Sequence, residues 1–241
     1  MSTALHPSIT DLTVNEFGDV NLWIGQGKLY QDVPEYVSKE LCRRMSTPTT
    51  EMSLLPSPSL AVLHLLDFPT SPITTSLQGV KPEELFSYNA ATHATLECLR
   101  LPAPSNDILR SLRTCAGQAM LDGKISVKHW DHDGIFLPFN ALGTWALIVE
   151  ADTAKNAWRD GLRWLDRLHR NEVIPTQYVP CVMKLLGTLP WKDHIKGLSS
   201  WLSITDMATF LSQDWLLDAH VDSMLSAVVH LRHNTLSHIV P

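Results

Sequence analysis

The residues that could do chemistry form a histidine-rich pentapeptide and a set of scattered cysteines. The pentapeptide, His129-Trp-Asp131-His132-Asp133, places four potential metal ligands within five residues. Transition metals accept imidazole together with carboxylate. Ligands adjacent in one loop seldom converge on a single ion, however, and the His-Glu-x-x-His spacing of a helical zinc site is absent. We therefore interpret the pentapeptide as a polar turn that leads into an apolar segment at Ile135, and we predict no metal and no cofactor.

Four cysteines lie along the chain without any pair at Cys-x-x-Cys spacing. They are Cys42, Cys98, Cys115 and Cys181. This spacing argues against a disulfide framework and against a zinc knuckle, so we predict reduced thiols. Cys115 and Cys181 each accompany apolar residues at helical spacing, which predicts small buried side chains without an activated thiolate. The competing hypothesis is an active cysteine-type peptidase that uses one of these two thiols with a histidine distant in the sequence.

The composition of the 241-residue chain is that of a globular protein, with 44% hydrophobic and 18% charged residues. This length predicts one compact unit with irregular flanks, or two small units. The net charge of −6 gives no long-range attraction to nucleic acid, so we interpret the arginine-rich stretch 159–170 as solvated surface. The apolar runs fall short of the about 18 residues that a membrane span needs, and Met1–Thr10 lacks the features of a secretory signal. We expect an intracellular protein that does not bind membranes.

The first part of the chain predicts two segments of different character. Residues 1–45 form a mixed segment, in which Val20–Ile24 alternates like a strand and Glu35–Met45 has helical spacing. Residues 46–104 hold repeated prolines among many serines and threonines. Proline removes a backbone donor and biases its predecessor toward extended geometry, so we interpret this segment as a linker or an extended wrap over the surface.

The pattern of residues 105–200 predicts a helical domain. The expected fold class is therefore mostly α, an irregular helical domain with a linker rich in proline, serine and threonine and a mixed N-terminal segment. The first helix runs from about residue 105 to Gly123. Its expected apolar face contains Ile108, Leu112, Cys115 and Ala119. A second helix starts near Asn140, a third follows with Thr153 as its candidate cap, and a fourth covers Val179–Leu186.

The last segment, residues 201–241, predicts two helices separated by a turn. Thr205 is placed to cap a short helix at Asp206–Leu211, and Asp218 to cap a second, amphipathic helix. The apolar residues of the second helix recur at i, i+3, i+4, i+7 and i+8, as Val221, Met224, Leu225, Val228 and Val229. Such a stripe predicts burial against another surface, so a Leu225→Asp substitution is expected to cost several kcal/mol.

The turn between these two helices carries the tetrapeptide Trp215-Leu216-Leu217-Asp218. Three pieces precede it in the chain, Trp158-Arg159-x-x-x-x-Trp164-Leu165, Leu189-Pro190-Trp191 and Lys196-Gly-Leu-Ser-Ser200. Taken in this order, the motifs resemble the pre-catalytic region of the ubiquitin-like-protein-specific, desumoylating cysteine proteases, in fungal members associated with mobile elements. The resemblance covers about residues 135–233, so residues 201–241 would be the truncated start of a protease-like domain.

In that family a Trp-Leu-Asn-Asp motif precedes the first helix of the catalytic domain. Its Trp contributes to the lid over the tunnel that takes the Gly-Gly tail of the substrate, and its Asp helps to hold the partner. The resemblance therefore implies that Trp215 and Asp218 contact a ubiquitin-like protein. Leu217 departs from the motif, because Asn is typical at that position.

The catalytic residues of such a protease are missing from the expected place in this chain. A cysteine protease needs a thiolate, a base, a group that orients the base, and oxyanion donors. In the family these follow the motif in the order His, Asp, Gln, Cys. After Asp218 the chain has four histidines and one acidic residue, Asp222, but neither cysteine nor glutamine. We therefore predict a non-catalytic helical protein that acts as an interaction module for a ubiquitin-like protein.

Overall fold

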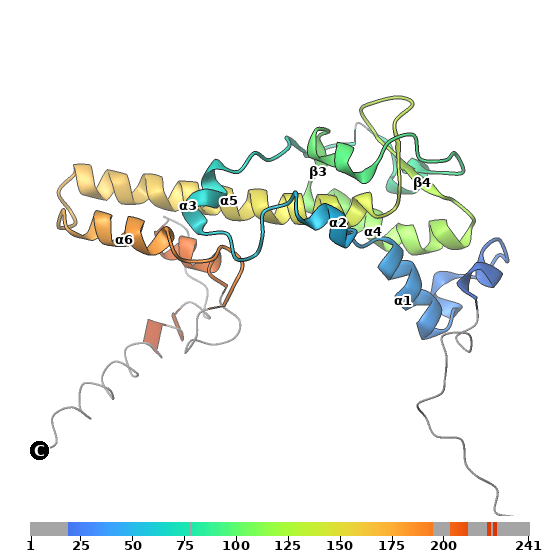
Figure 1. Ribbon diagram of the computed structural model, residues 1–241, viewed down its shortest axis with the longest axis horizontal. Coiled ribbons are helices and arrows are strands. Elements are labelled where there is room, and N and C mark those ends of the chain that lie inside the picture. The colour runs from blue at the N-terminus through green and yellow to red at the C-terminus, as the bar shows by residue number, and fades with distance from the viewer. Residues whose placement is uncertain (1–18, 78, 195–202, 212–220, 223, 226–241) are drawn as a thin grey trace, which may run out of the picture. The chain divides into compact units, whose positions relative to one another are not determined.

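The structure is a computed structural model that describes residues 19–77, 79–194, 203–211, 221–222 and 224–225. Over these residues it consists mainly of helices with a few short strands (Figure 1), which confirms the predicted mostly α fold class. No helix among the described residues combines the length and the apolar character that crossing a membrane requires.

The described residues fall into two compact units, each made of two stretches of chain. The first unit takes those of Met1–Pro48 and Ser71–Ala146, and the second those of Thr49–Thr70 and Leu147–Pro241. This division differs from the predicted segments, since the proline-rich residues 46–104 contribute to both units. The prolines divide that stretch into short elements, and some of the apolar side chains between them are buried, among them Leu55, Val62, Leu65 and Leu85.

The first unit begins with a 3-10 turn at Val20–Trp23, so the predicted strand at residues 20–24 is wrong. The carboxylate of Asp19 accepts a hydrogen bond from the backbone N–H of Asn21 at 2.9 Å, which closes the turn. Gly25 then adopts a φ of 75°, in the left-handed region that glycine enters without strain. Helix α1 follows at Glu35–Arg44 and confirms the helix expected there, with Val37 and Leu41 buried.

Helix α4 (Asn106–Leu121) is the long helix that belongs wholly to the first unit. Two of the four residues of the expected apolar face, Leu112 and Ala119, are buried. The buried residues are Leu109, Leu112, Ala116, Gly117, Ala119, Met120 and Leu121. Ile108 and Cys115 are only half-buried. The aromatic ring of Tyr30 lies directly over Gly117, where a β-carbon would collide with it.

Short strands complete the first unit. Strands β2 (Phe86–Ser87), β4 (Ser126–Lys128) and β5 (Phe136–Leu137) form an antiparallel sheet in the order β2-β4-β5. Val127 is paired with Phe86 on one side and with Leu137 on the other, and all three side chains are buried. A second pairing is parallel, between β1 (Ile73–Thr74) and β3 (Ala103–Pro104). The sheet places the histidine-rich pentapeptide in the hairpin between β4 and β5.

Helix α5 (Ala141–Arg170) is continuous where two separate helices were expected. Thr153 lies within it and is not a cap, because its hydroxyl donates to the carbonyl oxygen of Val149 at 2.7 Å. The sequence around Thr153 is rich in alanine, so nothing interrupts the helical hydrogen bonds. The boundary between the two units falls inside this helix, after Ala146.

The second unit contains α5 from Leu147 onward together with α2 (Thr49–Met52), α3 (Val62–Asp67) and α6 (Tyr178–Leu186). Helix α6 matches the predicted helix at 179–186. The buried core of the unit consists of Val62, Leu65, Ala151, Ala154, Trp158, Leu186, Trp191, Ile204 and Ala208. The indole N–H of Trp191 donates to the carbonyl oxygen of Ser57 at 2.8 Å, which ties the two stretches of chain together.

A 3-10 helix at Asp206–Leu211 closes this core and confirms the short helix expected there. Its cap is Ser203 rather than Thr205. The hydroxyl of Ser203 accepts from the backbone N–H of Asp206 at 3.2 Å, and the Asp206 carboxylate accepts from the backbone N–H of Ser203 at 2.8 Å. Thr205 instead donates to the carbonyl oxygen of Trp191 at 3.2 Å.

The same substitution at two leucines tests the core of the second unit. Leu65 on α3 is fully buried, whereas Leu185 on α6 is 51% exposed. We expect Leu65→Ala to lower the free energy of unfolding by about 2–5 kcal/mol, since it removes buried methyl groups and leaves a cavity. Leu185→Ala should change it by less than about 0.5 kcal/mol. Chemical denaturation of both variants measures the difference, and equal losses would show that α3 is not part of this core.

Candidate functional site

The tetrapeptide residues Trp215 and Asp218 lie outside the described residues. The helical residues that follow them include Val221, Met224 and Leu225, which are 44%, 50% and 59% exposed. The expectation that this apolar stripe is buried is therefore wrong for these three positions. Helical spacing makes a segment amphipathic, but it does not specify which surface covers the apolar face.

The thiol of Cys115 lies beside a carboxylate and not beside a base. Its Sγ donates to Oε1 of Glu83 at 3.5 Å. Burial raises the pKa of Cys115, and the hydrogen bond and the negative charge of Glu83 raise it further. A raised pKa disfavours the thiolate, which is the nucleophilic form. The surroundings of Cys115 therefore disfavour the thiolate, whereas those of an activated nucleophile favour it.

Cys181 is exposed on α6, although we expected it to be buried with the apolar residues of that helix. The buried residue of α6 is Leu186 instead. Within the described part of the chain, neither Cys181 nor Cys115 has an imidazole within hydrogen-bonding reach. The described geometry therefore supplies neither thiol with the base that a peptidase mechanism requires.

The histidine-rich pentapeptide forms a polar hairpin turn, as expected, except that His129 itself is fully buried. Its ring stacks on Trp130 with centroids 4.3 Å apart and meets Trp145 edge-on at 6.2 Å. Nε2 of His129 lies 3.3 Å from the carbonyl oxygen of Pro102, which can only accept, so Nε2 carries the proton. The pentapeptide thus anchors one end of the hairpin in the core of the first unit.

The other ring nitrogen of His129 is consequently an acceptor. Nδ1 accepts from the backbone N–H of Asp131 at 3.2 Å and lies 3.3 Å from Nδ1 of His132, which must then be the donor. Burial lowers the pKa of His129, the Pro102 hydrogen bond opposes this, and the neighbouring His132 lowers the pKa further. No group of three potential metal ligands converges among the residues that the structure describes. The arrangement holds the loop through hydrogen bonds to the buried ring of His129.

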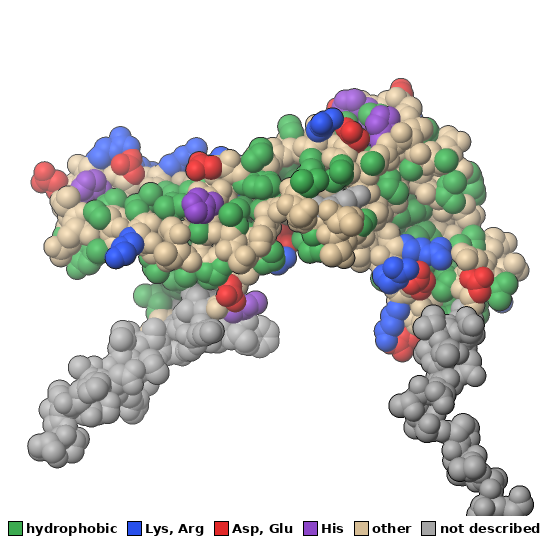
Figure 2. Space-filling model, viewed as in Figure 1, with side chains coloured by type: hydrophobic (Ala, Val, Ile, Leu, Met, Phe, Trp, Pro, Cys, Tyr) green, Lys and Arg blue, Asp and Glu red, His purple; other side chains and the backbone are tan. Residues whose placement is uncertain are grey.

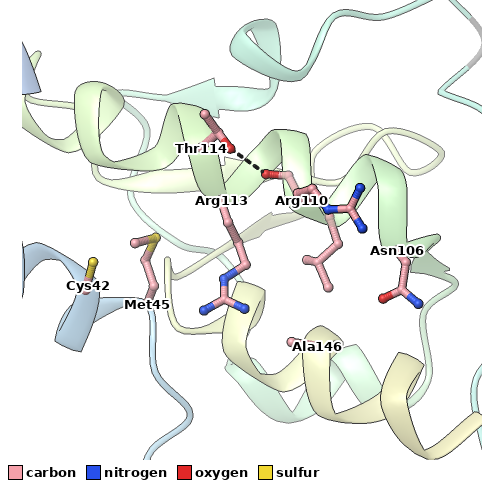
Figure 3. Close-up of a pocket in the computed structure, with 8 residues that line it drawn as sticks. Cys42, Met45, Asn106, Arg110, Arg113, Thr114 and Ala146 are labelled. Carbon is pink, nitrogen blue, oxygen red and sulfur yellow. Dashed lines mark hydrogen bonds between the residues drawn. The ribbon is translucent and has the colours of Figure 1, made fainter. Parts of the chain in front are cut away.

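The described residues form a pocket of ligand size that is open to solvent and that sequence reasoning missed. It lies between α1, α4 and the first turns of α5, and its volume is about 450 Å³ (Figure 3). Met45, Leu109 and Ala146 supply apolar surface, and Arg110 and Arg113 supply positive charge. The two arginines are three residues apart on one helix, so their proximity is visible in the sequence. The concavity is not, because it depends on the approach of α1 to α4.

The two arginines of this pocket differ in their partners. Arg110 lies 3.5 Å from the carboxylate of Asp107 in an exposed pair, whereas the guanidinium of Arg113 has no hydrogen bond or ion pair to any described residue. Figure 3 shows Arg113 extending from α4 into the space bordered by Met45 and Ala146. The pocket can therefore offer an unpaired, fork-shaped donor beside an apolar surface.

The arginine-rich stretch of α5 has a different character from the pocket. Arg163 pairs with Asp160 at 2.9 Å, and Arg170 pairs with Asp166. In Figure 2 acidic side chains lie next to basic ones in several places on the visible surface. The stretch 159–170 holds four arginines and two aspartates, so these two exposed pairs neutralise only half of its arginines.

Comparison with family models, with curated proteins and with solved structures gives no match. Function is therefore inferred from the described geometry and from the motifs in the sequence.

Cys115 should react slowly with iodoacetamide at about pH 8, because only the thiolate attacks and its pKa is raised. Glu83→Gln removes a negative charge next to the sulfur and should speed the alkylation of Cys115. Glu84→Gln, an exposed neighbour, is the matched control and should leave the rate unchanged. Peptide mass spectrometry at timed intervals measures the rates. If Cys115 is the fastest of the four thiols, the peptidase hypothesis gains and our interpretation fails.

Acidification should destabilise the chain through His129. Because the folded pKa is lowered from 6.5, the stabilisation is complete above that value and is lost as the pH falls below it toward the folded pKa. We expect Tm to fall between about pH 7 and pH 5, and to fall less steeply in His129→Gln. His194→Gln, at an exposed position, is the control and should keep the wild-type slope. A wild-type slope in His129→Gln would contradict this assignment.

Proposed function

We propose that this chain is a non-catalytic helical binding protein whose C-terminal segment docks on a ubiquitin-like protein. The observation that carries the proposal is the exposure of Val221, Met224 and Leu225, which have the i, i+3 and i+4 spacing of one helical face. Full burial of such a side chain contributes about 1.5–3 kcal/mol, so a partner that covers the face gains from all three.

The spacing of these three residues suits one mode of recognition. Positions i, i+3 and i+4 of an amphipathic helix form the anchor set that enters an apolar groove of a partner. Asp222 is exposed beside them and places a charge at the edge of the patch. The choice of a ubiquitin-like partner comes from the resemblance of Trp215 and Asp218, which directly precede this helix in the sequence, to the family motif.

The surroundings of Cys115 and Cys181 support the non-catalytic part of the proposal. Cys115 has a raised pKa beside Glu83, and Cys181 has no imidazole near it among the described residues. An active peptidase is the alternative. It would require a histidine to reach one of these two thiols.

A calorimetric titration of the intact chain with SUMO, and a second one with ubiquitin, test the proposal. Leu225→Asp should weaken the binding about tenfold or more, since a carboxylate would be buried in the interface. The same substitution at Leu185, which is 51% exposed on α6, is the matched control and should leave the affinity unchanged. Neither variant should lower Tm, because both positions are exposed.

Two outcomes would refute this function. One is a lack of measurable binding of either protein at about 1 mM. The other is cleavage of a SUMO or ubiquitin reporter that is abolished when Cys115 or Cys181 is replaced by alanine, which would establish the peptidase alternative.

A further inference from the structure

We propose that the pocket between α1, α4 and α5 binds a small ligand that carries a carboxylate or a phosphate on an apolar body. All of its lining residues belong to the first unit, and none belongs to the C-terminal helix discussed above. The inference therefore goes beyond the proposed function and does not depend on it.

The size of the pocket fits a small organic molecule. Its volume of about 450 Å³ lies within the range of about 300–1,000 Å³ that is usual for such sites. Met45 and Leu109 are 6% and 4% exposed, so the apolar surface that they present is fixed by the packing of α1 on α4. Ala146 has a small side chain and leaves room above α5. An apolar body can rest on these residues without rearrangement.

The charge of the pocket selects an anion. The side chain of Arg113 has no partner among the described residues, and the same holds for the amide of Asn106 at the start of α4. Asp107 is engaged with Arg110, and no carboxylate lines the pocket. An unpaired guanidinium prefers planar or tetrahedral oxyanions, which it binds through two parallel hydrogen bonds. The N-terminal end of α4 adds a partial positive charge beside Asn106.

The positive charge near the pocket is local, which favours a small ligand over a nucleic acid. On α1, Arg43 and Arg44 both pair with Glu40, at 2.6 and 3.3 Å. The whole chain has a net charge of −6. A long polyanion would meet paired arginines and acidic surface beyond the pocket, whereas a single oxyanion meets only Arg113 and its neighbours.

The geometry assigns the roles within the site. Arg113 is the principal anion anchor, Asn106 and Arg110 can add donors from the same helix, and Leu109 with Met45 holds the apolar body (Figure 3). Thr114 has already donated its hydroxyl hydrogen to the carbonyl oxygen of Arg110 at 2.9 Å, so it can offer the ligand only an acceptor. This leaves the arginine side as the face that an oxyanion would occupy.

The test uses the intact chain and four probes that separate the two parts of the ligand. Phenyl phosphate and benzoate carry both charge and ring, inorganic phosphate carries only charge, and benzyl alcohol carries only the ring. We expect phenyl phosphate or benzoate to shift the amide resonances of Arg113 and Ala146, and to bind about tenfold or more tightly than the two partial probes. The stronger of the two full probes identifies the preferred oxyanion. Equal binding of inorganic phosphate would overturn the apolar half of the proposal.

Variants identify the anchor. Arg113→Gln should weaken the binding of the full probes about tenfold or more, since a charged hydrogen bond is lost. Arg100→Gln is the matched control, because Arg100 is an exposed arginine of the same unit that pairs with Glu97 at 3.6 Å. Ala146→Leu fills the space above α5 and should exclude the ring while Tm shows that the fold persists. Unchanged affinity in Arg113→Gln, or no shift with either full probe at about 1 mM, would overturn the proposal.

Discussion

Both hydrophobic cores depend on the burial of a tryptophan from the same helix. Trp145 and Trp158 on α5 are 0% and 2% exposed, and each lies among the buried side chains of its own unit. Their indole N–H groups are buried and find no acceptor among the described residues, at a cost of about 1–3 kcal/mol each. Packing outweighs that cost, because truncation of a buried aromatic ring costs about 3–5 kcal/mol. A single uninterrupted helix is therefore the element on which the fold relies.

The pocket follows from two places where backbone and side chain come unusually close. A β-carbon on Gly143 of α5 would collide with the backbone of Met45 and Thr47, so glycine lets this stretch lie directly against the helix. Met45 is thereby fixed as part of the apolar surface of the pocket. Gly117 plays the same role for Tyr30, whose hydroxyl lies 3.5 Å from Sγ of Cys42 at the edge of the pocket. That contact, together with burial and the charge of Cys42, raises the pKa of Tyr30 to about 12.

The sequence predicted the elements whose character is local and missed those set by distant contacts. The helical spacing of apolar residues at 35–45 and 179–186 was sufficient to predict α1 and α6, and Gly187 marked the end of α6. The segment expected as a strand at 20–24 is a 3-10 turn that the side chain of Asp19 caps. On α4, Leu112 and Ala119 are buried as expected, but the close packing of Tyr30 on Gly117 joins residues far apart in the chain and could not be predicted. The pocket could not be foreseen, because its two arginines become a site only when α1 closes one side.

The two proposed binding surfaces share a physical property that the cores lack. Leu225 is exposed, and Arg113 has no partner among the described residues, so neither contributes a packed contact or an ion pair that folding requires. Surface substitutions of this kind usually change stability by less than about 0.5 kcal/mol. Loss of binding at either position can therefore be separated from loss of fold. In the two proposals, Leu225 offers apolar area to a large partner, whereas Arg113 offers a charge in a concave site to a small ligand.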